Sequence, residues 1–196
     1  MFRLPYLLVA NWVAQLQFEF AKKQESKALA KIEDNFATVR HLMLNCWLRL
    51  EITLDLCNSI FLLIDDGHTL GTQLPVSLKP KIALFKKAHQ KIGIFSALAQ
   101  EADEIAVELR RLSIVRHDVT HGLKGATAPD GSTTFSRIRS VGDTWQTATT
   151  TYSVNDLTRA MTEISDLEAR INRHHDLLRD IITETLNADD ANNLLG

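Results

Sequence analysis

The sequence predicts an all-α protein, an antiparallel helical bundle with a small β-hairpin inserted before the last helix. Four long segments have apolar residues at the three- and four-residue spacing of amphipathic helices. A stretch rich in Gly, Thr and Ser separates the third segment from the fourth. The length of 196 residues fits one domain with extensions.

The strongest helical pattern covers residues 27–65. Apolar residues recur there every seven positions, with a second series three positions later: Leu29, Phe36, Met43, Leu50, Cys57 and Ile64, then Ile32, Val39, Cys46 and Ile60. This spacing predicts one long helix with a broad buried face. Cys46 and Cys57 are eleven residues apart, which is about 16 Å along a helix. They are therefore expected to be core thiols without a disulfide between them.

Two shorter helices are expected next, over residues 78–92 and 94–121. Ser77 is a suitable N-cap for the first, and Gly93 separates the two. The apolar stripe of the second runs through Phe95, Ala102, Leu109 and Leu112, and Gly122 follows its last turn.

Residues 133–152 predict a two-stranded hairpin. Two runs rich in Thr and aromatic residues, 133–139 and 145–152, are separated by a turn signal at Gly142-Asp143. The last helix is expected over residues 154–186, with Ser153 as N-cap and Asp156 three residues later. We therefore divide the chain into a helical extension (1–26), a helical domain (27–187) and a flexible tail (188–196).

Composition and charge narrow the possible functions. With 22 basic and 24 acidic residues, the formal net charge is −2. Any nucleic-acid contact must therefore come from a local basic patch. No apolar run is long enough to span a bilayer, so the protein is expected in the cytoplasm, without a membrane partner. P-loop, dinucleotide-binding and serine-hydrolase motifs are absent from the sequence.

Polar, titratable residues gather where the third helix is expected to end. The heptad series Phe95, Ala102, Leu109 predicts an apolar residue at position 116, but the sequence has Arg116 there. His117, Asp118, Thr120 and His121 follow directly. A charge on a buried stripe needs a partner or a function. His exchanges protons near neutral pH, and Arg binds phosphate.

Structural roles and metal binding are the alternatives for this segment. Arg116 can pair with Glu51, and His121 can cap the helix C-terminus. His117 and His121 are one helical turn apart, so with Asp118 or His41 they are conceivable metal ligands. A His-Glu-x-x-His motif is missing, so we expect no metal and no cofactor.

The segment Arg116-His-Asp-Val-Thr-His121-Gly resembles the R-x4-H motif of the HEPN superfamily, where R-N-x-x-x-H followed by Gly is common. The surroundings agree, because Leu50-Glu51 lies in a long helix and Ser77 to Ile82 reads Ser-x-Lys-x-Lys-Ile. The resemblance covers residues 30–185. One departure is His117, where the family usually has Asn.

The resemblance implies a helical domain, often a homodimer, with the two motifs facing each other. Many such domains are metal-independent endoribonucleases, and others are non-catalytic nucleotide-binding, RNA-binding or interaction modules. The implied catalytic residues are Arg116 and His121. Six further residues are expected to support them or to bind RNA: His117, Asp118, Thr120, Lys124, Arg137 and Arg139. A toxin or defence role with an antitoxin or other regulatory partner is a further implication.

Helix geometry and the spacing of residues along a strand indicate which of these side chains can act together. Positions 116 and 121 lie about 140° apart around an ideal helix, so a second copy or a distorted last turn is expected to bring them together. Arg137 and Arg139 share a strand face with Phe135. An aromatic ring beside two Arg side chains suits single-stranded RNA.

Overall fold

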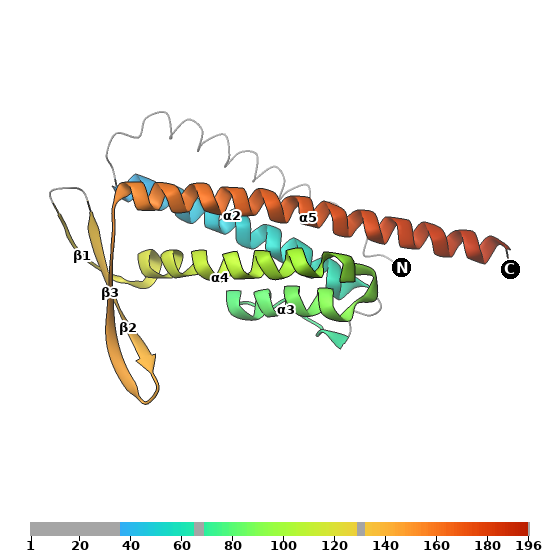
Figure 1. Ribbon diagram of the computed structural model, residues 1–196, viewed down its shortest axis with the longest axis horizontal. Helices are drawn as coiled ribbons and strands as arrows, with labels where there is room; N and C mark the ends of the chain where they lie inside the picture. The colour runs from blue at the N-terminus through green and yellow to red at the C-terminus, as the bar shows by residue number, and fades with distance from the viewer. Residues whose placement is uncertain (1–35, 65–68, 129–131, 196) are drawn as a thin grey trace.

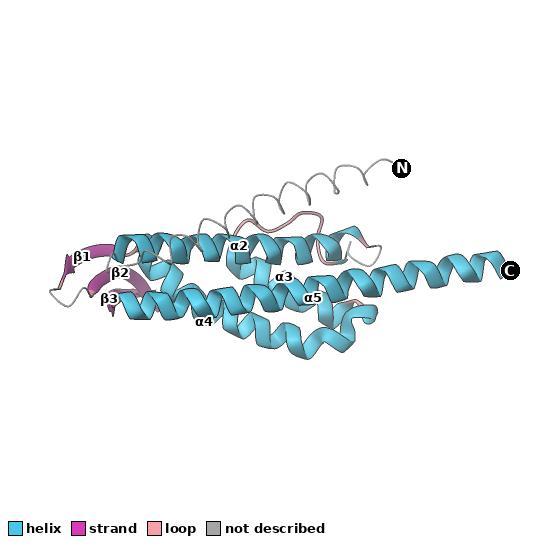
Figure 2. Ribbon diagram, turned by 90° about the horizontal axis from the view of Figure 1, so that it is seen from above, coloured by secondary structure: helices cyan, strands magenta, loops and turns pink. Residues whose placement is uncertain are grey.

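The computed structural model describes residues 36–64, 69–128 and 132–195. Within these ranges the protein is mostly helical, with one small antiparallel sheet (Figures 1 and 2). The α-helices are α2 (Phe36–Leu63), α3 (Leu78–Lys91), α4 (Ala99–His121) and α5 (Val154–Leu195). The sheet stands at one end of the bundle, between the end of α4 and the start of α5 (Figure 1).

Helix α2 follows the predicted long pattern from Phe36 to Leu63. The predicted helical extension over 1–26 and residues 27–35 of the long pattern lie outside the described ranges. The predicted stripe of α2 is buried, with Met43, Leu50 and Cys57 at 0% exposure. Cys46 and Cys57 are both buried and have no disulfide between them, as expected. Burial also raises the pKa of the Cys57 thiol.

The helices expected at 78–92 and 94–121 are present with changed boundaries. A 3₁₀ helix, η2 (Gly93–Leu98), replaces the first turn of the longer one, so α4 begins at Ala99. Ser77 occupies the N-cap position of α3 but makes no side-chain capping hydrogen bond. The predicted stripe of α4 is buried at Ala102, Ile105 and Leu109.

The sheet has three strands in the order β1-β2-β3, whereas the sequence predicted two. Strands β2 (Thr133–Val141) and β3 (Thr144–Tyr152) form the predicted hairpin. The unpredicted strand β1 (Leu123–Thr127) pairs antiparallel with β2. Its sequence, LKGAT, lacks the alternation and the β-branched run that indicate a strand, and its pairing with β2 defines it.

Helix α5 begins as predicted and ends later than predicted. The Ser153 hydroxyl accepts from the Asp156 N–H at 3.1 Å, and the Asp156 carboxylate accepts from the Ser153 N–H at 2.9 Å. This reciprocal pair is a capping box. The helix continues to Leu195, beyond the expected end at 186, and its last turns extend past the other helices (Figure 2).

Helices α2 and α5 form the main packing contact of the bundle. Apolar side chains fill their interface, and a buried ion pair joins Arg49 of α2 to Glu168 of α5 at 3.2 Å. No described helix combines the length and the apolar character that crossing a membrane requires.

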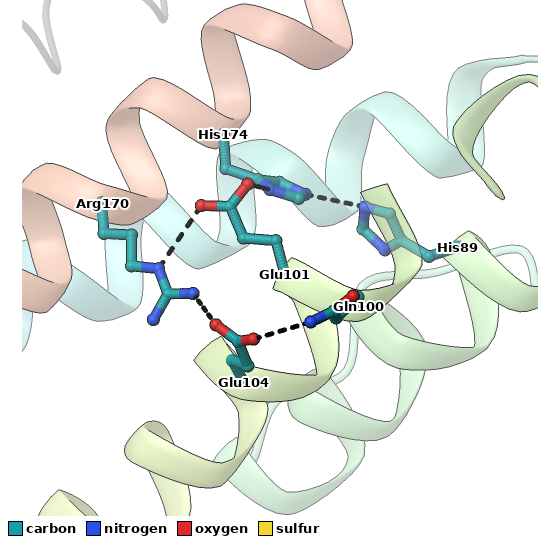
Figure 3. A network of polar contacts seen from close by, with 6 residues as sticks. All are labelled: His89, Gln100, Glu101, Glu104, Arg170 and His174. Atoms are coloured by element: carbon teal, nitrogen blue, oxygen red, sulfur yellow. Dashed lines mark hydrogen bonds and ion pairs between the residues drawn. The ribbon is translucent and has the colours of Figure 1, made fainter. Parts of the chain in front are cut away.

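A buried polar network joins α3, α4 and α5 away from the sheet (Figure 3). His89 Nδ1 donates to the Phe85 carbonyl at 2.8 Å, so its Nε2 must accept the proton of His174 Nε2, 2.7 Å away. His174 Nδ1 faces Glu101, which also accepts from Arg170. A proton added to His89 would place two N–H groups against each other.

Acid should therefore destabilise the bundle through His89. Burial lowers the pKa of His89 from 6.5 to about 4, and nearby His174 lowers it while Glu101 and Asp103 oppose the shift. Below pH 6.5 the unfolded chain binds more protons than the folded one, so stability is lost as the pH falls from 6.5 to 4. At 1.36 kcal/mol per pKa unit the loss is about 3 kcal/mol. Urea unfolding across this pH range measures it.

The His89→Gln variant should show a flatter dependence of unfolding free energy on pH. His41→Gln is the matched control, because it removes an exposed imidazole of α2 outside the buried network, and the slope for His89→Gln should be flatter than the slope for His41→Gln. Equal slopes for wild type and His89→Gln would contradict this assignment.

Candidate functional site

The last turn of α4 brings Arg116 and His121 together within one chain. Arg116 Nη1 donates to His121 Nε2 at 3.2 Å. Positions 116 and 121 lie far apart around the helix, and the sequence suggested that a second copy or a distorted turn would bring them together. The long Arg116 side chain spans this angular separation instead. Because guanidinium only donates, Nε2 is the acceptor in this contact and the ring proton lies on Nδ1. His121 is exposed and Arg116 is half-buried.

His117 lies beside this pair on the exposed side of the helix. Its ring centroid is 4.9 Å from that of His121, with the two planes inclined at 55°. The contact restricts the His121 ring from one side. Glu51, the alternative partner expected for Arg116, instead accepts a hydrogen bond from the Trp47 indole.

Asp118 is 2% exposed and joins the helix end to the sheet. Its Oδ2 accepts from the Tyr152 hydroxyl of β3 at 2.8 Å. Its Oδ1 lies 2.6 Å from Nε of Arg137 on β2. This contact is an ion pair between the buried carboxylate and the guanidinium. Asp118 therefore holds the strands against the helix that bears Arg116 and His121.

Two further features define how α4 ends. Arg40 of α2 donates to the carbonyl of Val119 at 2.8 Å, which satisfies a terminal carbonyl and places a cation at the negative end of the helix. The N–H of Gly122 donates to the Asp118 carbonyl at 2.8 Å. The sequence suggested that His121 caps the helix C-terminus. Arg40 takes this role instead, through its hydrogen bond to the Val119 carbonyl.

The remaining predicted site residues lie around this helix end in different environments. Thr120 is half-buried, and Lys124 is exposed on β1. Arg137 is 16% exposed at its side chain and is engaged by Asp118. Arg139 lies on β2 opposite Gln146 of β3, and its side chain is outside the description. The expected stacking role of Phe135 is wrong, because Phe135 is 2% exposed and packs on Phe36 and Tyr152.

In the described part of the chain, no three His, Cys, Asp or Glu side chains are grouped so that they could hold a metal ion. Asp118, the nearest carboxylate in sequence to the His117–His121 pair, is engaged by Tyr152 and Arg137. His41 contacts Asn45 on its own helix. The site therefore offers an Arg, two imidazoles and nearby basic side chains.

Sequence reasoning missed Arg40 and Tyr152, which complete the support of the site. Arg40 is 79 residues from Val119, and Tyr152 is 34 residues from Asp118. Neither contact has a local sequence signal, since each depends on how distant elements pack.

No family model, curated protein or solved structure matches the chain.

Replacement of Gly122 by Ala should disturb the end of α4. A Cβ at this position would lie 2.4 Å from the carbonyl oxygen of Asp118 and 3.0 Å from Cβ of Phe135. Both neighbours are held by the packing of helix against sheet, so the overlap should cost about 1–3 kcal/mol of unfolding free energy. Urea unfolding measures this loss.

Gly93→Ala is the matched control, because a Cβ there has no heavy atom within 4 Å. It should leave stability nearly unchanged. A Gly122→Ala protein as stable as Gly93→Ala would contradict the close approach of helix end and strand.

Proposed function

We propose that this protein is a metal-independent endoribonuclease of the HEPN type, with Arg116 and His121 as its catalytic residues. The observation that supports the proposal most is their contact at 3.2 Å at an accessible helix end. The helical bundle and the order of its elements agree with the HEPN resemblance. The two buried thiols, which form no disulfide with each other, suit a reducing compartment, and we place the protein in the cytoplasm.

The proposed chemistry uses the 2′-OH of RNA as the nucleophile. In this arrangement the lone pair of His121 Nε2 accepts from Arg116. Once the guanidinium turns to the phosphate, Nε2 can take the 2′-OH proton as a general base. Arg116 has four further N–H donors, which can bind the phosphate and stabilise charge in the transition state. The 2′-oxygen bonds to phosphorus as the P–O5′ bond breaks, and the leaving 5′-oxygen takes a proton from solvent. The products are a 2′,3′-cyclic phosphate and a 5′-hydroxyl.

A non-catalytic nucleotide-binding, RNA-binding or interaction module is the second candidate. His117 in place of the usual Asn favours it, as does the burial of Asp118, whose contacts fix the helix end. In this alternative Arg116 and His121 bind an anion without cleaving it.

We further propose a homodimer and a regulatory protein partner such as an antitoxin, both from the resemblance alone. The contact between Arg116 and His121 within one chain removes the need for a second copy to bring these two side chains together. Light scattering at high micromolar concentration should give the mass of a dimer, and a monomer would contradict that part of the proposal.

Replacing either catalytic residue should stop RNA cleavage. His121→Ala should lower the single-turnover rate by about 10²–10⁴-fold, the usual contribution of proton transfer. Arg116→Ala should also lose activity, and Arg116→Lys should recover little because Lys lacks the planar fork. RNA with a 2′-deoxy group at the scissile position should resist cleavage, and excess chelator should not inhibit. Gel assays with end-group analysis measure these outcomes.

His41→Ala is the control variant, because His41 is an exposed imidazole on a different helix. It should cut RNA at the wild-type rate. Cleavage of the 2′-deoxy substrate, or activity that disappears with chelator and returns with a divalent cation, would contradict the mechanism. Folded wild-type protein that cuts no RNA would favour the non-catalytic alternative.

A further inference from the structure

The two edges of the sheet are built differently. The strand order leaves β1 at one edge and β3 at the other, and among the described residues β3 pairs with β2 alone. The β1 edge has five residues, contains Lys124 and Gly125, and shifts its register between Lys124 and Thr127. A short strand, a lysine and a bulge are devices that keep a sheet edge from pairing with another chain. The β1 edge is therefore protected.

The β3 edge has none of these features. Its nine residues, TWQTATTTY, contain no charge, no proline and no glycine, and they pair with β2 in regular register along the whole strand. Thr, Trp and Tyr are residue types that favour strands. The side chains from Thr144 to Thr147 are exposed, and the hairpin projects from the end of the bundle (Figure 1). A long, regular and uncharged edge that is open to solvent is a template for a further strand.

Backbone groups of alternate residues point to the free edge of β3. Gly142 and Asp143 form a two-residue turn, so the flanking pair Val141–Thr144 is hydrogen-bonded across the hairpin. In an antiparallel ladder, hydrogen-bonded pairs alternate with pairs that are not hydrogen-bonded. The even-numbered residues of β3 therefore bond to β2. The outward N–H and C=O groups belong to the odd-numbered residues of this strand: Trp145, Thr147, Thr149 and Thr151.

These outward groups match a second copy of the same strand. With Ala148 on a two-fold axis, an antiparallel copy of β3 places Trp145 opposite Thr151, and Thr147 opposite Thr149. The hydrogen-bonded pairs of the new ladder are then formed by the groups that β2 leaves unused. Ala148 meets its own copy across the axis with a small side chain. No like charges face each other, because the strand has none.

The same pairing gives the exposed Trp145 a neighbour. Its side chain is 76% exposed in the single chain, and the odd-numbered residues of β3 share its face of the sheet. In the joined sheet Trp145 lies opposite Thr151 of the second copy, with Thr149 of that copy diagonal to it. An aromatic ring beside β-branched residues is a favourable cross-strand contact. The pairing therefore satisfies the backbone of the edge and covers its largest apolar side chain together.

We propose that two copies of this protein associate through β3, so that their three-stranded sheets join into one continuous antiparallel sheet. The same strand serves on both sides, which makes the interface closed and two-fold symmetric. The homodimer proposed above rests on the HEPN resemblance, whereas this interface rests on the edge of the sheet. It goes beyond the proposed function, because the pairing uses neither Arg116 nor His121 and requires no RNA.

A cysteine on the two-fold axis tests this register directly. Ala148→Cys places two thiols in a pair without hydrogen bonds, where Cα atoms are about 4.5 Å apart and a disulfide can form. Mild oxidation of the full chain at high micromolar concentration should convert most of this variant to a covalent dimer on a non-reducing gel. Gln146→Cys is the matched control on the same strand face, because its two copies would lie more than about 13 Å apart. Cys46 and Cys57 are buried and should not cross-link.

A proline at the edge tests the hydrogen bonds. Thr147→Pro removes an outward N–H and leaves the ladder to β2 intact, since proline is tolerated at sheet edges. It should raise the Kd of the dimer by about 5- to 150-fold, because each copy loses one backbone hydrogen bond. Thr147→Val retains the N–H and should dimerise like wild type. Light scattering over a concentration series measures both, and circular dichroism verifies that each variant is folded.

Three results would overturn the inference. The first is a wild-type protein that stays monomeric at high micromolar concentration, which would leave the β3 edge to an extended segment of another protein. The second is an Ala148→Cys protein that cross-links no better than Gln146→Cys. The third is a folded Thr147→Pro protein with the dimer Kd of Thr147→Val. None of these measurements involves RNA cleavage, so the interface and the nuclease proposal fail separately.

Discussion

The buried carboxylate of Asp118 is the interaction on which the arrangement of the candidate site depends. It accepts the Tyr152 hydroxyl and pairs with Arg137, so a single side chain of α4 holds both long strands of the sheet. Its backbone carbonyl accepts from the N–H of Gly122, the C-cap residue that follows His121. Arg116 and His121 flank Asp118 in sequence, so their positions follow from this anchor. A buried charge without these partners would be strongly unfavourable, which ties helix and sheet into one unit.

The bundle supplies a rigid base for that unit. Arg40 of α2 reaches across to the Val119 carbonyl, and Phe36 at the start of the same helix packs on Phe135 of the sheet. At the far end, His89, Glu101 and His174 join α3, α4 and α5 through buried polar contacts (Figure 3). The polar residues of α4 thus have distinct tasks. Glu101 connects helices within the bundle, Asp118 anchors the sheet, and Arg116 contacts His121 at the helix end.

Periodicity predicted the four described α-helices, because burial of one face imposes a repeat that is visible in the residues themselves. It did not predict the 3₁₀ helix η2 or the continuation of α5 to Leu195. The same logic identified Arg116, a charge in a stripe that ran through Ala102 and Leu109. Strand β1 escaped prediction because its identity depends on pairing with β2 rather than on its own residues. Phe135 was assigned to the wrong role for a related reason. The sequence correctly placed Phe135 and Arg137 on the same strand face. Whether that face meets solvent or the bundle depends on tertiary packing. Arg40 and Tyr152 were missed because each meets the site from a distant part of the chain.

The central claim is that Arg116 and His121 act as one catalytic unit on an anchored helix end. A double-mutant cycle on the single-turnover rate of RNA cleavage tests it most directly, with Arg116→Ala, His121→Ala and the double variant, each verified to be folded. Residues that act together in one transition state lose nearly as much singly as jointly. If Arg116 and His121 act as one unit, the double variant is close in rate to the slower single variant. Multiplicative losses, or a single variant that retains the wild-type rate, would contradict it.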